Sequence, residues 1–186
     1  MSNIIEGFRA ARARIKPEGF AFSAASSYMS PTIMVPLYGA LTYAAHEANT
    51  VFDTNAFTVG AIAVLGIANA ISITAEAKAL TKEGYSSSVI ANTLQVATGN
   101  PLLSSIGGHV SNYAQLFLIN PINSAALLSE NRELLTESLG ATSLTLTAWL
   151  TAMNSLVITG KTKEFTDGVT RVRKYIAQKI IPARQK

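Results

Sequence analysis

A long stretch without any charged side chain, from Thr54 to Ala75, constrains this chain more than any other feature. At about 1.5 Å per residue it would form a helix of roughly 33 Å. The hydrocarbon core of a bilayer is roughly 30 Å thick, so a helix of this length is sufficient to cross it. The sequence therefore predicts a membrane-spanning helix over 54–75.

Small residues recur along this stretch at three-, four- and seven-residue steps. They form what we call the small-residue ridge: Ala56, Gly60, Ala63 and Ala70, with Gly66 close beside them. In lipid, where the hydrophobic effect does not drive helices together, small residues allow helix backbones to approach closely. We therefore expect this helix to pack against helical neighbours through the ridge.

The charged residues of the chain are confined to a few segments. Only 14% of the residues are charged, against roughly 25% in a typical soluble domain. They cluster at 6–18, 47–53, 76–83, 130–137 and 161–186. A soluble helical bundle would carry charges on its wet face at every turn or two, so the long gaps predict a membrane protein. The mean hydropathy of +0.27 is modest because the gaps are rich in Ala, Ser, Thr and Asn, which suits helices that face protein more than lipid.

The sign of the charge in each of these segments predicts the number of membrane crossings. By the positive-inside rule the segments with lysine and arginine face the cytoplasm or its equivalent: 1–18, 76–83 and 161–186. The acidic segments face outward: 47–53 and 130–137. This arrangement requires one net crossing within 84–129, a gap that Gly99-Asn100-Pro101 divides. We expect four crossings, both termini inside, and a non-crossing helix before or after Pro101.

Capping residues suggest where two of the crossings begin or end. Ser30-Pro31 resembles an N-cap followed by proline at the first helical position, which predicts a crossing from Pro31 toward Asn49. Pro36, one turn inside, should kink that helix. The last crossing is predicted from Ser138 to Gly160, with Gly160 as its C-terminal cap.

Both ends of the chain have the pattern of basic amphipathic helices. The first 18 residues carry Arg9, Arg12, Arg14 and Lys16 around an apolar face. A second such helix, predicted from Thr166, carries Arg171, Arg173, Lys174 and Lys179 around a stripe of Val169, Val172, Ile176 and Ile180. Such segments suit a membrane surface with anionic lipid head groups. The first arm also resembles an organellar transit peptide, although Glu6 and Glu18 argue against that interpretation.

Polar residues inside the charge-free gaps are the candidate sites. His109 is an ionisable residue inside the gap 84–129, and as an intramembrane group it could serve as a proton relay or a cofactor ligand. The alternative is a neutral imidazole that is hydrogen-bonded to a neighbour and fixes helix packing. The other candidates are Asn69, Asn112, Gln115 and Asn154. They could line a polar pathway with His109, or form hydrogen bonds between helices.

The patterns of the common catalytic and metal sites are missing from this sequence. His46-Glu47, with Asp53 nearby, lacks the second histidine of the H-E-x-x-H zinc motif, and the chain has no cysteine. No phosphate loop, dinucleotide fingerprint or G-x-S-x-G elbow is present. We therefore expect no enzyme activity, no metal and no cofactor. The pI near 9.4 does not indicate nucleic-acid binding, because the basic residues lie mainly in the two terminal arms.

These observations together predict an all-α polytopic membrane bundle forming a single domain over residues 1–186, with arms at 1–18 and 161–186 around a bundle at 31–160. The expected role is that of a non-catalytic integral subunit, packed against other membrane subunits or copies of itself. The expected location is the inner membrane of a bacterium or an organelle. Two alternatives stay open: a small channel or transporter around His109, and a soluble or virion-associated oligomeric bundle.

Overall fold

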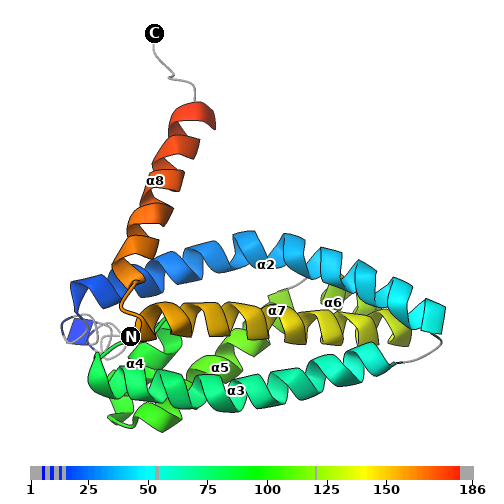
Figure 1. Cartoon of the computed structure of the whole chain (residues 1–186), viewed down its shortest axis with the longest axis horizontal. Helices are drawn as coiled ribbons and strands as arrows, with labels where there is room; N and C mark the ends of the chain where they lie inside the picture. Colours follow the sequence, from blue (N-terminus) through cyan, green and yellow to red (C-terminus); the bar gives the residue numbers. More distant parts are fainter. Residues whose placement is uncertain are drawn as a thin grey trace.

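The protein is built from α-helices, as the sequence predicts (Figure 1). The computed structural model describes residues 6, 9, 10, 13, 16–52, 55–119 and 121–180, and within them there is no strand. The helices are α2 (Pro17–Phe52), α3 (Ala56–Lys82), α4 (Val89–Thr98), α5 (Pro101–Ile119), α6 (Pro121–Leu128), α7 (Arg132–Ile158) and α8 (Thr162–Ile180).

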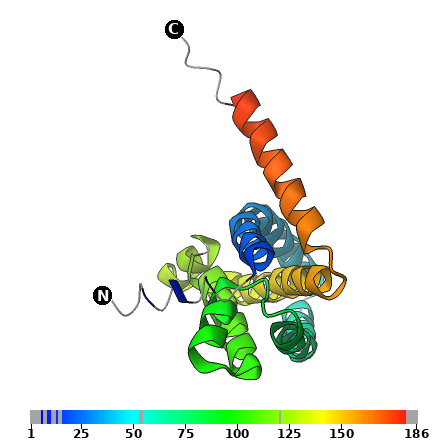
Figure 2. The same ribbon diagram turned by 90° about the vertical axis from the view of Figure 1, so that its left-hand side faces the viewer.

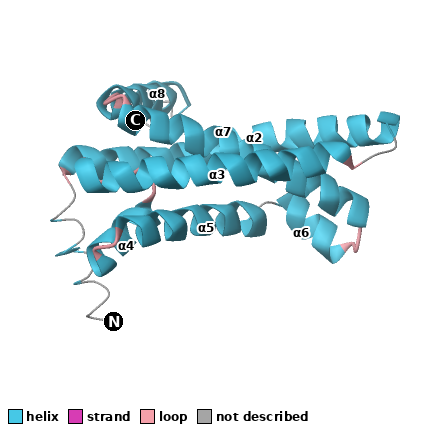
Figure 3. Cartoon of the chain, turned by 60° about the horizontal axis from the view of Figure 1, so that its bottom comes forward, coloured by secondary structure: helices cyan, strands magenta, loops and turns pink. Residues whose placement is uncertain are grey.

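Four of these helices, α2, α3, α5 and α7, lie side by side along the long axis of the molecule (Figures 1 and 3). α2 and α5 run in one direction, and α3 and α7 run in the other. α4 forms a hairpin with α5 at one end of the bundle, and α6 lies at the opposite end (Figure 3). α8 leaves the bundle beside the start of α2 and points away from the long axis (Figures 1 and 2).

The two ends of the bundle differ in their charged residues. One end, where α2 begins and α3 and α7 finish, holds all the lysines near the bundle, beside several glutamates; we call it the basic end. Its charged residues include Lys16, Lys78, Lys82, Lys161 and Lys163, with Glu18, Glu76, Glu83 and Glu164. The other end, where α2 finishes and α7 begins, we call the acidic end, and it carries Glu47, Glu130, Glu133 and Glu137 with Arg132. Both α8 and the first residues of α2 lie at the basic end.

α7 is the central helix of the bundle. One apolar cluster, near the basic end, joins Met153 and Val157 of α7 to Phe22, Ala79 and Tyr85. A second, in the middle, joins Leu146 and Leu150 to Met34 and Leu65. Phe22 also meets Phe165 of α8 edge to face, with ring centroids 5.7 Å apart, so α8 is anchored at its base.

Local side-chain chemistry explains the breaks between the helices. Gly99 ends α4 with a φ of 65°, a conformation that glycine adopts without the steric penalty of a side chain. The Asn100 side chain then accepts hydrogen bonds from the backbone N–H groups of Leu102 and Leu103, each at 3.1 Å. Pro101 occupies the first helical position, where its missing N–H is not needed. The predicted break at 99–101 is confirmed.

The end of α7 also follows the prediction. Gly160 has a φ of 70°, its N–H bonds the Val157 carbonyl at 3.1 Å, and the N–H of Lys161 bonds the Leu156 carbonyl at 2.9 Å. This pair of bonds is the Schellman arrangement, which satisfies carbonyl groups that a helix end leaves free. It turns the chain sharply from α7 into α8.

Several predicted boundaries are wrong, and α2 shows why. α2 begins at Pro17 rather than Pro31, so Pro31 and Pro36 both lie inside one continuous helix. The added turns pack against the rest of the protein, since Phe22, Ser23 and Ser26 are buried there. Tertiary packing therefore outweighs the local signal of Ser30-Pro31.

The charged segments that were predicted to connect crossings are also largely helical. α2 continues to Phe52 and α3 to Lys82, while α7 already begins at Arg132 and α8 at Thr162. Asp53, in the first of these segments, lies outside the described residues. Charged residues in these segments extend the helices beyond the apolar stretches instead of ending them.

Two helices, α3 and α7, are long and apolar enough to cross a membrane by length and composition, among the described residues. Their surroundings differ, because 22% of the apolar segment of α3 is buried inside the protein against 50% of that of α7. α3 therefore exposes most of its apolar surface, whereas α7 is half covered by its neighbours.

Candidate functional site

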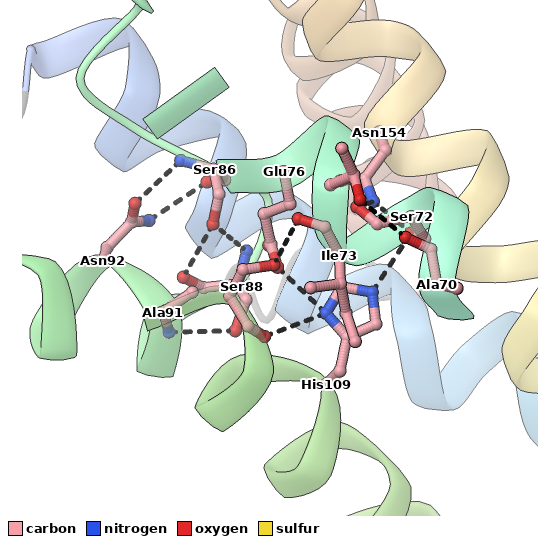
Figure 4. A network of polar contacts seen from close by, with 12 residues as sticks. Ala70, Ser72, Ile73, Glu76, Ser86, Ser88, Ala91, Asn92, His109 and Asn154 are labelled. Atoms are coloured by element: carbon pink, nitrogen blue, oxygen red, sulfur yellow. Dashed lines mark hydrogen bonds and ion pairs between the residues drawn. The ribbon is translucent and has the colours of Figure 1, made fainter. Parts of the chain in front are cut away.

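Five polar side chains from three helices meet inside the bundle, toward its basic end. We call them the polar cluster: Ser72 and Glu76 of α3, Ser105 and His109 of α5, and Asn154 of α7. None of the five residues is more than 5% exposed. Figure 4 shows Ser72, Glu76, His109 and Asn154 pointing toward one another across the three helices.

His109 is bonded through both nitrogens of its ring. Its Nδ1 lies 3.0 Å from Glu76 Oε2 and 3.0 Å from the Ser105 carbonyl oxygen, and its Nε2 lies 3.1 Å from Ser72 Oγ. A backbone carbonyl can only accept a hydrogen bond, so this geometry assigns a hydrogen to Nδ1. In the neutral ring Nε2 then accepts a hydrogen bond from the Ser72 hydroxyl.

Asn154 and Ser105 complete the hydrogen bonding of the cluster. The Asn154 amide donates to Ser72 Oγ and, at 3.4 Å, to the Ser72 carbonyl. The Ser105 hydroxyl is shared between Glu76 Oε2 at 2.8 Å and the Ile73 carbonyl at 3.0 Å. The donors thus run in one line from Asn154 through Ser72 and His109 to Glu76. A carboxyl group this far from water is tolerated because it is hydrogen-bonded.

Hydroxyl, imidazole and carboxyl groups stand here in the order of a Ser–His–acid relay. In such a relay the serine must reach a substrate, yet Ser72 is only 5% exposed and its oxygen already accepts a hydrogen bond from Asn154. A neighbouring cavity between α2, α5 and α7 is lined by other residues. The geometry therefore favours a cluster that ties α3, α5 and α7 together.

The structure brings together only some of the residues that the sequence singled out. His109 and Asn154 both contact Ser72. Asn112 and Gln115 instead line the separate cavity just mentioned, where Gln115 bonds Ser111 at 3.3 Å. Asn69 is half-buried on α3 and is not part of either group. The candidate residues therefore lie in three separate places, the polar cluster, the cavity and a position on α3, and do not form one continuous polar pathway.

The sequence analysis did not single out three residues of the cluster, Ser72, Glu76 and Ser105. Glu76 was missed because its charge placed it in a connecting segment. A helical pattern could have found it. The buried positions of α3 include Thr58, Ala61, Leu65, Ser72 and Glu76, at steps of three, four, seven and four residues. This single face continues past Ala75, so Glu76 points inward with the rest.

The small-residue ridge does not pack inside this chain as expected. All five of its residues lie on the exposed face of α3. A Cβ atom added at Gly60 or Gly66 would meet nothing within 4 Å. The packing face of α3 is the opposite one, where Gly140 of α7 would place a Cβ 3.2 Å from the Thr58 backbone. The expected close approach of helices is therefore made by Gly140.

The predicted basic surface is exposed wherever it is described. Arg9 and Lys16 are exposed, whereas Arg12 and Arg14 lie outside the described residues. On α8 the four basic residues are all exposed: Arg171, Arg173, Lys174 and Lys179.

A second histidine and carboxyl pair links α2 to α7 at the acidic end. His46 Nδ1 lies 2.9 Å from Glu137 Oε1, and the side chains are 53% and 4% exposed respectively. This hydrogen bond joins an exposed side chain of α2 to a buried carboxyl group of α7. His46 thus pairs across helices instead of with Glu47. Within the described residues no group of three or more side chains could hold a metal ion.

Comparison with known proteins did not identify a family for this chain. No protein-family model, no curated protein and no solved structure matches this chain. The function must therefore be argued from the residues and their geometry.

The polar cluster predicts the effect of removing its carboxyl group. Glu76→Ala removes the acceptor that the Ser105 hydroxyl and His109 Nδ1 share. A lost hydrogen bond costs roughly 0.5–1.5 kcal/mol, so the two together cost about 1–3 kcal/mol. We expect the free energy of unfolding to fall by that amount and the melting temperature in mild detergent to fall with it. Glu83→Ala is the matched control, because Glu83 is partly exposed and lies 3.9 Å from Lys82. Equal melting temperatures for the two variants would contradict the assignment.

Proposed function

We propose that this protein is a non-catalytic integral membrane subunit that packs within a larger membrane assembly. The observation that carries the proposal is an inverted distribution of polarity on α3. Its outward face exposes Val59, Ile67 and Ile71, each at 65–67%, while its inward face buries Thr58, Ser72 and Glu76. A surface helix of a soluble protein has the opposite arrangement. Lipid or apolar helices of a partner would cover the outward face.

The other long helices support the same conclusion. Apolar side chains lie exposed on α2 and α5 as well: Ile33, Val35, Leu37, Leu102, Leu103, Ile106 and Val110. The interior around α7 is rich in hydroxyl groups, with Thr142, Ser143 and Thr145 all buried. Interfaces of small and hydroxylated residues are typical of helices that pack inside a membrane.

The proposed topology has four crossings, made by α2, α3, α5 and α7. Their alternating directions along the bundle support it, since each helix would return the chain to the other side (Figure 1). The basic end would face the cytoplasm or matrix and the acidic end the opposite side, in agreement with the positive-inside rule. α4 and α6 would not cross. α8, which leaves the basic end away from the bundle axis, would place its arginines and lysines among anionic head groups.

Three engineered cysteines, each introduced singly, would test this topology, since the chain has none of its own. Lys82 and Glu133 are both exposed and lie at the basic and acidic ends. With one crossing between them, we expect a membrane-impermeant maleimide to label Lys82→Cys and Glu133→Cys from opposite sides of sealed vesicles. Lys163→Cys, at the start of α8, should label from the same side as Lys82→Cys. Labelling of Lys82→Cys and Glu133→Cys from one side would contradict the four-crossing arrangement.

The small-residue ridge is the surface that we assign to a partner helix. Its glycines lie exposed among the branched apolar side chains of α3, and nothing in the described chain occupies the space above Gly60 and Gly66. Another membrane helix could approach the backbone of α3 closely there, which is the packing that small residues permit in lipid.

Bulky substitutions on the ridge should therefore release the partner without harming the fold. We expect Gly60→Ile and Gly66→Ile to lower the mass of the particle extracted from native membranes in mild detergent, with the melting temperature of the isolated chain unchanged. Gly39→Ile on α2 is the control, because a Cβ there also meets nothing within 4 Å. Unchanged particles in both ridge variants would contradict a partner at this surface. A wild-type particle that contains only this chain would instead favour a channel or transporter.

A further inference from the structure

A cavity of about 170 Å³ lies between α2, α5 and α7, apart from the polar cluster. One part of its wall is polar and includes Ser26, Ser27 and Asn112. Another part is apolar and includes Met34, Leu146 and Trp149. The residues that line it include no Asp, Glu, Lys, Arg or His, so the cavity offers hydrogen bonds but no countercharge.

Several polar side chains of this wall make no hydrogen bond to the described residues, and Ser26 and Asn112 are two of them. Ser26 is only 3% exposed, yet its hydroxyl bonds neither a backbone carbonyl nor another side chain. The side-chain amide of Asn112, half-buried on α5, is likewise free. Their neighbours differ, since the hydroxyl of Ser30 bonds Met34 Sδ at 2.9 Å and that of Ser88 caps α4. The Ser26 hydroxyl and the Asn112 amide are therefore available to donate hydrogen bonds to a molecule that occupies the cavity.

The chemistry of the lining selects a class of ligand. A charged head group would lie in this cavity without a counterion, which disfavours phospholipids and nucleotides. An apolar cavity of about 150 Å³ holds one benzene molecule, so this one is of the size of a single ring. The polar wall would direct carbonyl oxygens of that ring toward Ser26 and Asn112, and the indole of Trp149 would cover the ring.

We propose that this cavity binds the head group of a lipid-soluble quinone, with the Ser26 hydroxyl and the Asn112 amide as donors to a ring carbonyl. The proposal rests on the proposed membrane function, because the ligand would enter from the bilayer between the exposed side chains of α2 and α5. Only binding is proposed, and no electron transfer is assigned to this chain. The apolar tail of the quinone would remain in lipid.

The single tryptophan of the chain provides the measurement, since Trp149 lines the cavity. A short-chain benzoquinone is titrated into the purified full-length protein in mild detergent, and tryptophan fluorescence is recorded. We expect saturable quenching in the wild type. Ser26→Leu and Asn112→Leu, which remove a donor and fill space, should raise the concentration for half-quenching roughly tenfold, the loss expected for one or two hydrogen bonds. Ser155→Leu, at an exposed position of α7, should leave it unchanged.

A second measurement guards against variants that fold poorly. The quinone should raise the melting temperature of the wild type in a concentration-dependent way, as any ligand specific for the folded state does. Asn112→Ala changes a half-buried residue and should keep the ligand-free melting temperature while losing this shift. Quenching that rises linearly and equally in all variants, without a thermal shift, would overturn the proposal. That result would leave the cysteine-labelling topology intact, so the two proposals fail separately.

Discussion

The hydrogen-bonded line from Asn154 through Ser72 and His109 to Glu76 determines how the long helices pack. Apolar and hydroxylated helix faces can slide past one another with little change in energy, because most of their contacts are similar. The buried carboxyl group of Glu76 cannot move in this way without losing its hydrogen-bond donors, which are His109 and Ser105 on α5. A shift of α3 by one residue would carry Glu76 away from both. The polar cluster therefore fixes the register of α3 against α5 and, through Asn154, against α7.

Most other polar groups in the interior do not specify a partner. The hydroxyls of Thr42, Ser143 and Thr145 bond the carbonyl one turn earlier in their own helices, at 2.7–2.9 Å. These bonds satisfy the hydroxyl groups locally and let neighbouring helices approach closely. Pairing between elements depends on a smaller set of bonds. They include the polar cluster, the His46–Glu137 pair, the 2.6 Å bond from Tyr38 to Asn123, and the bonds that join Asn92 to Ser23, Tyr85 to Thr162 and Thr58 to Thr136.

The sequence predicts those features that depend on neighbouring residues. The all-α class, the break at Gly99-Asn100-Pro101 and the cap at Gly160 follow from local composition and capping chemistry, and the structure confirms them. Glu76 was missed because its partners His109 and Ser105 lie about thirty residues further along the chain, on another helix. When no partner can be identified, a glutamate is correctly predicted to lie at a solvent-exposed position. The prediction that the small-residue ridge packs against helices of this chain was wrong for a related reason. The periodicity of a sequence identifies one face of a helix, but it does not identify the neighbour that covers that face.

The parallel course of α3 and α7 has a consequence for how the chain reaches this structure. The bonds from Thr58 to Thr136 and from Asn154 to Ser72 join residues 78 and 82 apart in sequence, whereas α3 and α5 meet across 29–37 residues. Closing the longer loops carries the larger entropy penalty, and contacts of this kind slow folding. The inward face of α3 therefore finds its partners in two stages. α5 can cover part of it early, and the face is complete only after α7 has been synthesised.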